Sequence, residues 1–240
     1  MKNRPFAIMV VGLSITIVLA GVLLAFAWHL HGRNAQPTIP RPEGVPSNLS
    51  TDVVNLMQLS PVPHHAAPDF TFIDQHGQRV SLHSLRGKNV VLNFMDPHCT
   101  DICPIVSQEL IDANHDLGPL AKNTVFLAIN VNQYNRSVAN VAHFSNEHRL
   151  SSIPSWHFLT GSYHALAAAW SSYGIAVYAP SPSADVQHSS VTYFINTRGQ
   201  EEYLAAPMVD HTKKGVSYLP AVKLNAWGQG IAQVVRDLTS

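Results

Sequence analysis

The sequence predicts an α/β domain behind a single transmembrane helix. Two nearly continuous apolar runs, residues 90–95 and 125–131, have the pattern of strands buried on both faces. Apolar residues at helical spacing over 102–110 separate these runs, so the three segments predict a strand–helix–strand unit. The apolar run over residues 6–28 has no charged residue and is long enough to cross a bilayer.

The N-terminal segments predict a membrane protein whose domain lies outside the cytoplasm. Lys2 and Arg4 precede the apolar run, and the positive-inside rule then keeps the N-terminus in the cytoplasm. The expected location is the cell membrane, with the domain in the periplasm or at the cell surface. Ala25-Phe26-Ala27 resembles a signal-peptide cleavage site, so a cleaved leader is the alternative.

A proline-rich stretch follows, with prolines at positions 37, 40, 42, 46, 61 and 63. Such a composition favours an extended, semi-rigid spacer. We therefore expect an anchor over residues 1–28, a linker over 29–64 and a folded domain over 65–240.

The remaining elements of the domain follow in order. Strand patterns occupy residues 69–73 and 80–82 around a turn at Gly77, and further strands are expected at 156–159, 191–195 and 203–205. Helical patterns are expected at 138–148, 163–170 and 227–238. Two parallel strands, then two antiparallel strands, flanked by helices, is the thioredoxin-like order.

The composition excludes some functional classes. Lys and Arg total 15 and Asp and Glu total 15, so the net charge of +0 argues against nucleic-acid binding. Two cysteines do not make a disulfide-rich scaffold. The 14 histidines are an unusual enrichment, and they would make the protein cationic in mild acid.

The candidate site is the C-x-x-x-C motif of Cys99 and Cys103, where the first buried strand leads into the helix. A helix N-terminus favours thiolates, and two thiolates there can chelate one ion or close a disulfide. Sulfur ligands favour Cu(I), and imidazole extends the affinity to Cu(II). His188 lies just before the 191–195 strand, in a loop that approaches the cysteine helix in a thioredoxin-like fold.

Four alternatives to a metal site are open. A disulfide across so short a loop would add only about 2 kcal/mol of stability, so a purely structural bridge is disfavoured. A thiol–disulfide oxidoreductase would normally carry C-x-x-C and a proline in the facing loop, where residues 185–190 have a histidine instead. A peroxidase needs an activating partner that residues 95–100 lack. A purely structural module leaves the two cysteines and the histidine unexplained.

Together these motifs resemble the Sco/SenC family of copper-binding proteins. The resemblance runs from about residue 67 to 199 and includes APDFTFIDQHGQRVSL, VVLNF, C-x-x-x-C-P, YGIAVY and QHSSVTYFINTRG. It implies a thioredoxin-like fold that binds copper through Cys99, Cys103 and His188, with a redox disulfide between the cysteines. It also implies delivery of copper to the dinuclear site of cytochrome c oxidase subunit II, or to another cuproenzyme, with other copper chaperones as further partners. Reduction of that site's cysteines is the implied alternative.

The chain departs from the family pattern at three places. Thr100 stands where a proline is common, and Asn132-Gln133 stands where Asp-Pro is usual. Residues 207–223 look like an insertion that carries His211. Neither His211 nor His98, which adjoins the first cysteine, receives a role from the sequence.

Overall fold

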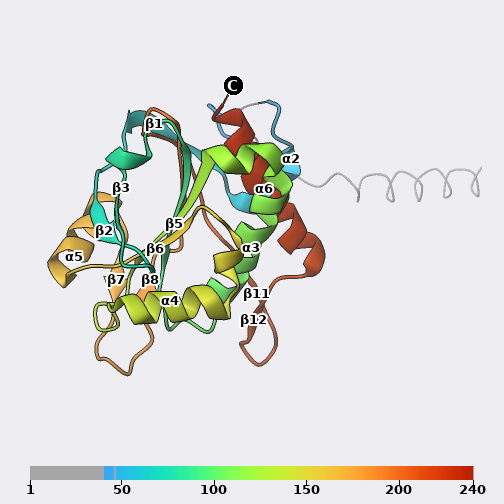
Figure 1. The fold of residues 1–240 in the computed structure, drawn as a ribbon. Coiled ribbons are helices and arrows are strands. Elements are labelled where there is room, and N and C mark those ends of the chain that lie inside the picture. Colours follow the sequence, from blue (N-terminus) through green and yellow to red (C-terminus); the bar gives the residue numbers. More distant parts are fainter. Residues whose placement is uncertain (1–40, 46, 240) are drawn as a thin grey trace, which may run out of the picture. The chain divides into compact units, whose positions relative to one another are not determined.

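A six-stranded sheet in the order β1-β10-β9-β4-β5-β6 organises the described part of the computed structural model, residues 41–45 and 47–239 apart from the His64 side chain (Figure 1). β4, β5 and β6 are parallel, whereas β9, β10 and β1 add in antiparallel fashion. The strands are β1 (Ser60–Ala66), β4 (Asn89–Met95), β5 (Thr124–Asn130), β6 (Trp156–Leu159), β9 (Thr192–Ile195) and β10 (Gln200–Ala205).

The centre of the sheet forms because β4 and β5 are mostly apolar and are covered on both faces. All seven residues of each strand are buried, as the sequence predicts for strands covered on both faces. β4, α3 (Ile102–Leu117) and β5 make the predicted strand–helix–strand unit, and β9 and β10 follow as the predicted antiparallel pair. The predicted thioredoxin-like α/β fold is therefore confirmed for the described residues.

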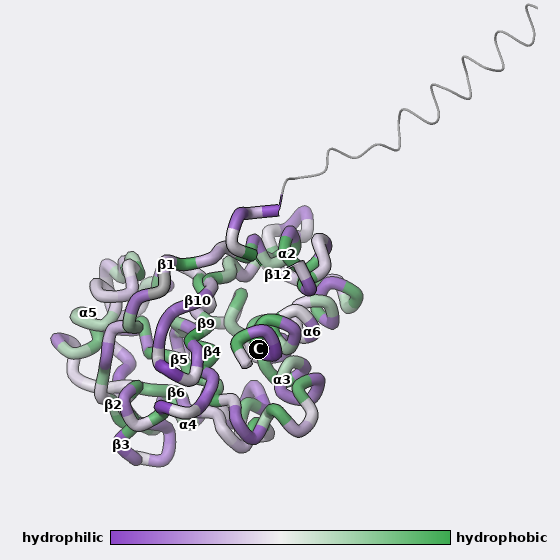
Figure 2. Tube along the Cα trace, turned by 90° about the horizontal axis from the view of Figure 1, so that it is seen from above, coloured by the Kyte–Doolittle hydropathy of each residue, from purple (hydrophilic) through white to green (hydrophobic). Residues whose placement is uncertain are grey.

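Helices cover the sheet on both faces, as Figure 1 shows. One apolar cluster packs α2, α3, α4 and α6 against the sheet. A second cluster packs α5 and the small ladder of β2 (Thr71–Ile73) and β3 (Arg79–Ser81) against the other face. In Figure 2 the green, hydrophobic stretches of α3 and α6 lie next to each other. The α-helices are α2 (Thr51–Met57), α3 (Ile102–Leu117), α4 (Val138–Glu147), α5 (Tyr163–Ser172) and α6 (Ala221–Asp237). Short 3₁₀ helices span His83–Leu85, Gly118–Asn123 and Leu150–Ser152.

Within the described residues, three two-stranded ladders accompany the main sheet. They consist of β2 (Thr71–Ile73) with β3 (Arg79–Ser81), β7 (Val177–Tyr178) with β8 (Gln187–His188), and β11 (Asp210–His211) with β12 (Ser217–Tyr218). The first ladder is the predicted hairpin around Gly77. The last ladder lies within residues 207–223, the segment predicted to be an insertion.

The folded unit begins earlier than the sequence predicts. Residues 41–64, expected to belong to a spacer, contain α2 and most of β1 and pack into the domain. Val53 and Met57 of α2 contact α6 at Gly230, where an added Cβ would lie 2.6 Å from the Met57 sulfur. The prolines of β1 fit a strand at the edge of the sheet, since only one side of that strand pairs.

The predicted membrane helix over residues 6–28 lies outside the described residues. Within the part of the chain that the structure does describe, no helix combines the length and apolar character needed to cross a membrane.

Candidate metal centre

The two cysteines lie at the junction between the C-terminal end of β4 and the start of α3. The loop between these elements turns tightly, because the backbone N–H of Cys99 donates to the Asp96 carbonyl at 3.1 Å. The Asp96 carboxylate accepts a further bond from the backbone N–H of His98 at 2.8 Å. This loop leaves Cys99 half-buried and directs Cys103, on the first turn of α3, into the interior.

The two thiols are free and differ in acidity. The backbone N–H of Cys103 points at the Cys99 sulfur, 3.4 Å away. A hydrogen bond from the Cys103 thiol, with the backbone N–H groups of Cys103 and Asp101, lowers the pKa of Cys99 to about 7. The same thiol–thiol bond, together with burial, raises the pKa of Cys103. Cys99 is therefore the thiolate of the pair near neutral pH, and Cys103 holds the proton.

His188 is positioned by the β7–β8 ladder, in which it pairs with Val177. Its Nδ1 lies 3.0 Å from the Ser189 carbonyl. A carbonyl oxygen only accepts, so Nδ1 carries the hydrogen in this bond and the neutral ring has its lone pair on Nε2. Burial lowers the pKa of His188, which keeps the ring neutral at neutral pH. A neutral imidazole with a lone pair is the form that binds a metal.

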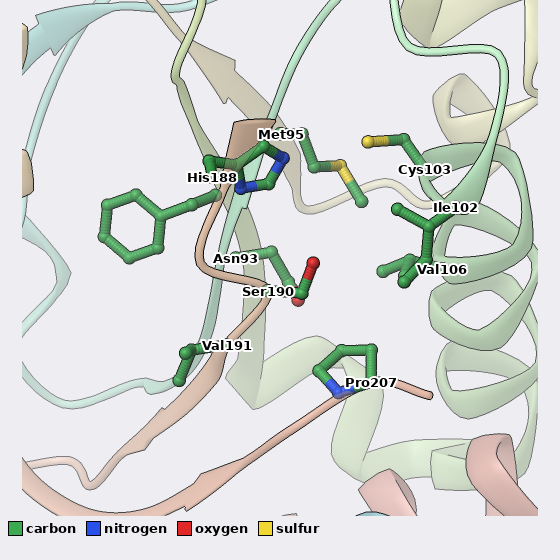
Figure 3. A pocket seen from close by; sticks show the side chains of 10 residues that line it. Asn93, Met95, Ile102, Cys103, Val106, His188, Ser190, Val191 and Pro207 are labelled. Carbon is green, nitrogen blue, oxygen red and sulfur yellow. The ribbon is translucent and has the colours of Figure 1, made fainter. Parts of the chain in front are cut away.

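A small pocket contains both Cys103 and His188 (Figure 3). Its volume of about 10 Å³ is roughly enough for one water molecule. The lining residues are Asn93, Phe94, Met95, Ile102, Cys103, Val106, His188, Ser190, Val191 and Pro207. Because most of this lining is apolar, the few donor atoms that face the pocket are shielded from competing water.

Only two of the three predicted ligands, Cys103 and His188, line the same pocket. Cys99 contacts Cys103 but does not line the pocket that Cys103 shares with His188. Among the described residues, no group of three His, Cys, Asp or Glu side chains is arranged to hold a metal ion. The chemistry of the donors fits a soft metal such as copper, but Cys99 or His188 must move before all three reach one ion.

Sequence reasoning assigned no role to two polar residues beside this site, Asp96 and Asn132. Asp96 is buried, and its negative charge acts on Cys99, Cys103 and His188. A buried negative charge at this position stabilises a cation in the pocket. Asn132, one of the departures from the family pattern, donates its amide N–H to the Asp96 carboxylate at 2.9 Å. It therefore fixes the position of that charge. Gln133 donates to the Ala179 carbonyl at 2.8 Å, which ties the same loop to the segment after β7.

Asn93 was also missed, although it precedes Met95 by two positions on the same strand. Its side-chain oxygen Oδ1 accepts from the Thr192 hydroxyl at 2.7 Å, whereas its buried side-chain nitrogen Nδ2 has no hydrogen-bond partner among the described residues. The alternation of side chains along β4 was the available signal, because positions 93 and 95 share the face that α3 covers.

Neither of the two remaining histidines lines the pocket. His98 is exposed in the cysteine loop, and His211 is exposed on β11. Pro207, at the start of the insertion, lines the pocket.

Comparison with known proteins gives consistent matches. The SCO1/SenC family matches residues 60–214, which is more than half of the chain. The SCO1 protein homolog of Bacillus subtilis (strain 168) is 28% identical over 142 residues, covering 58% of this chain and 72% of that protein.

Solved structures with a similar fold include two Sco proteins. Arabidopsis thaliana ScoI with copper bound superposes with a TM-score of 0.55 at 23% identity, covering 72% of this chain and 99% of that chain. BsSco is described as a member of the Sco family of cytochrome c oxidase assembly proteins with a disulfide switch. It superposes with a TM-score of 0.52 at 23% identity, covering 73% of this chain and 97% of that chain.

Proposed function

We propose, since the chain belongs to the SCO1/SenC family, that it is a copper metallochaperone. In this proposal it binds copper through Cys99, Cys103 and His188 and delivers the metal to the dinuclear site of cytochrome c oxidase subunit II. One observation carries the proposal: the buried Cys103 thiol and the His188 ring, with its lone pair on Nε2, line one small apolar pocket. The copper-bound Arabidopsis thaliana ScoI, which has the same fold, supports it.

The chain's own residues prepare the site for a soft cation. The Cys99 thiolate is accessible from solvent and would meet an incoming Cu(I) ion first. Cys103 loses its proton as the metal replaces it, because copper binding and proton binding compete for the same sulfur. His188 lines the same pocket and would supply a nitrogen ligand, and the negative charge of Asp96 adds to the attraction for an incoming cation. Departure of the metal returns the proton to Cys103.

A second function, reduction of the acceptor's disulfide, rests on the unequal acidity of the two thiols. The Cys99 thiolate would attack one sulfur of that disulfide, forming a mixed disulfide and releasing the acceptor's other sulfur as a thiolate. Cys103, after losing its proton, would then attack the Cys99 sulfur. The products are a Cys99–Cys103 disulfide and a dithiol on the acceptor. Two electrons pass from this chain to the acceptor.

Copper transfer with thiol counting separates the two functions. The reduced, Cu(I)-loaded chain is mixed with a reduced subunit II fragment, copper is measured in each protein by mass spectrometry, and free thiols are counted by alkylation. A chaperone loses copper and keeps both cysteines reduced. A second arm mixes the copper-free chain with the disulfide form of the fragment. Accumulation of a Cys99–Cys103 disulfide there, with no copper transfer in the first arm, would overturn the chaperone proposal in favour of the reductase.

The proposal also places the domain outside the cytoplasm, held by an anchor over residues 6–28. Protease added to intact cells, after removal of any outer membrane, should then release the domain. Protection of the domain under those conditions would contradict this location.

A further inference from the structure

The last residue of β4, Met95, lies on the face of the sheet that α3 covers. Side chains alternate along a strand, and Val91 and Met95 accordingly pack in the apolar cluster with α3, whereas Leu92 and Phe94 pack on the opposite face. Met95 is only 1% exposed. Its position at the end of the strand places it next to the first turn of α3, where Cys103 lies.

Met95 lines the same pocket as Cys103 and His188. Figure 3 shows its thioether sulfur directed toward the Cys103 thiol, with the His188 ring on the other side of the methionine. The three side chains come from β4, α3 and β8, so the fold brings together donors that are far apart in the sequence. A thioether is a soft, neutral donor that prefers Cu(I) to Cu(II).

We propose that the Met95 sulfur is a copper ligand, which the pocket uses together with Cys103 and His188. This inference rests on the proposed copper-binding function. Of the three predicted ligands, only Cys103 and His188 line the pocket, because Cys99 lies outside it. The pocket therefore lacks a third soft donor if only the predicted ligands are counted. Met95 supplies a third donor without any movement of the cysteine loop.

A thioether ligand has two consequences for the bound metal. It has no proton to lose, so acid does not displace copper from it as it does from thiolates and imidazole. Its softness favours the reduced ion, so the site should retain Cu(I) more strongly than Cu(II). The alternative is that Met95 has a purely structural role in the core. In that case copper has no contact with its sulfur.

X-ray absorption at the selenium edge distinguishes these readings. The full-length chain is prepared with selenomethionine, solubilised in mild detergent, reduced and loaded with one Cu(I). Copper should then appear as a neighbour of selenium, at an amplitude of about one fifth because the chain has five methionines. The selenium–copper signal should vanish in Met95→Leu. It should persist in Met57→Leu, a matched control because Met57 is equally buried but packs between α2 and α6.

Competition against a coloured Cu(I) chelator gives the affinity. Loss of a hydrogen-bonded outer partner typically weakens metal binding by about 10–100-fold, so loss of a ligand in Met95→Leu should weaken Cu(I) binding at least tenfold. Met57→Leu should leave the affinity unchanged. Binding of Cu(I) with no copper near selenium would overturn this inference and leave the proposed function intact. Failure of the unaltered chain to bind Cu(I) would overturn both. The unaltered chain gives the decisive signal even if Met95→Leu does not fold.

Discussion

Glu109 should make the stability of the domain depend steeply on pH. This residue of α3 is 1% exposed, and neither carboxylate oxygen has a hydrogen-bond partner among the described residues. Burial, reinforced by the negative charge of Asp112, raises the pKa of Glu109 to about 8 from an ordinary value of 4.5. The folded protein therefore holds a proton on this carboxyl over a pH range in which the unfolded chain has lost it.

The sign and size of the effect follow from linkage between protonation and folding. Between pH 4.5 and 8 the folded state binds more protons than the unfolded state, so the free energy of unfolding falls as pH rises through this window. Below pH 4.5 and above pH 8 this residue contributes no slope. Each pH unit is worth about 1.4 kcal/mol, so the full loss is about 5 kcal/mol. That loss is comparable with the total stability of many domains, about 5–15 kcal/mol.

Glu109→Gln tests this reasoning by urea unfolding from pH 4 to 9 on the reduced, copper-free chain shortened to begin at Arg41. Near pH 4 the variant and the unaltered chain should have similar unfolding free energies. Above pH 8 the variant should be more stable by up to about 5 kcal/mol. Glu43→Gln is the matched control, because it makes the same substitution at an exposed position. Parallel pH profiles for Glu109→Gln and the unaltered chain would refute the reasoning.

Three further predictions concern the domain boundary and the site. Starting the chain at Pro61 instead of Arg41 removes α2 and should lower the unfolding free energy by several kcal/mol, measured by urea unfolding; equal stability of the two chains would contradict the boundary at Arg41. Cys99 should be alkylated with a midpoint near pH 7 while Cys103 stays protected in the folded protein, as peptide mass spectrometry can show; equal rates at both thiols would contradict the assigned difference. His188→Ala should weaken Cu(II) binding more than Cu(I) binding in chelator competition, since Cu(II) favours nitrogen ligands. Unchanged affinity of His188→Ala for both ions would exclude His188 as a ligand. Because burial lowers the pKa of His188, Cu(II) binding to the unaltered chain should also persist to more acid pH than an exposed histidine would allow.

The sequence predicts the centre of the fold well because strong patterns define it. β4 and β5 contain nearly continuous apolar runs, and α3 between them has clear helical spacing, so local pattern and tertiary burial agree. β1 was missed for a physical reason. Its prolines resemble a spacer, and an edge strand tolerates proline because only one side pairs. Strand pairing with β10, distant in sequence, decides its structure.

The residues of the site also differ in how far the local sequence predicts them. Cys99, Cys103 and His188 were predictable because the thiols and the imidazole have distinctive chemistry at recognisable positions. Met95 was not predicted, because methionine at the end of an apolar strand is ordinary core material. Its position in the pocket depends on which face of β4 is covered by α3 and on where the β7–β8 ladder places His188. These are long-range relations that no local pattern contains.

The pocket, rather than the pair of cysteines, separates the two proposed functions. Both functions use an accessible thiolate at Cys99 and a buried thiol at Cys103, so unequal acidity is compatible with either. Thiol–disulfide exchange needs only these two sulfurs and the acceptor's disulfide. His188 and Met95 have no bond to form or break in that exchange, yet they line the pocket that holds Cys103. A neutral imidazole with its lone pair on Nε2 and a soft thioether, both beside a buried thiol, form a donor set for a soft metal. Substitutions at these two positions should therefore impair copper binding and leave disulfide exchange by the cysteines largely intact.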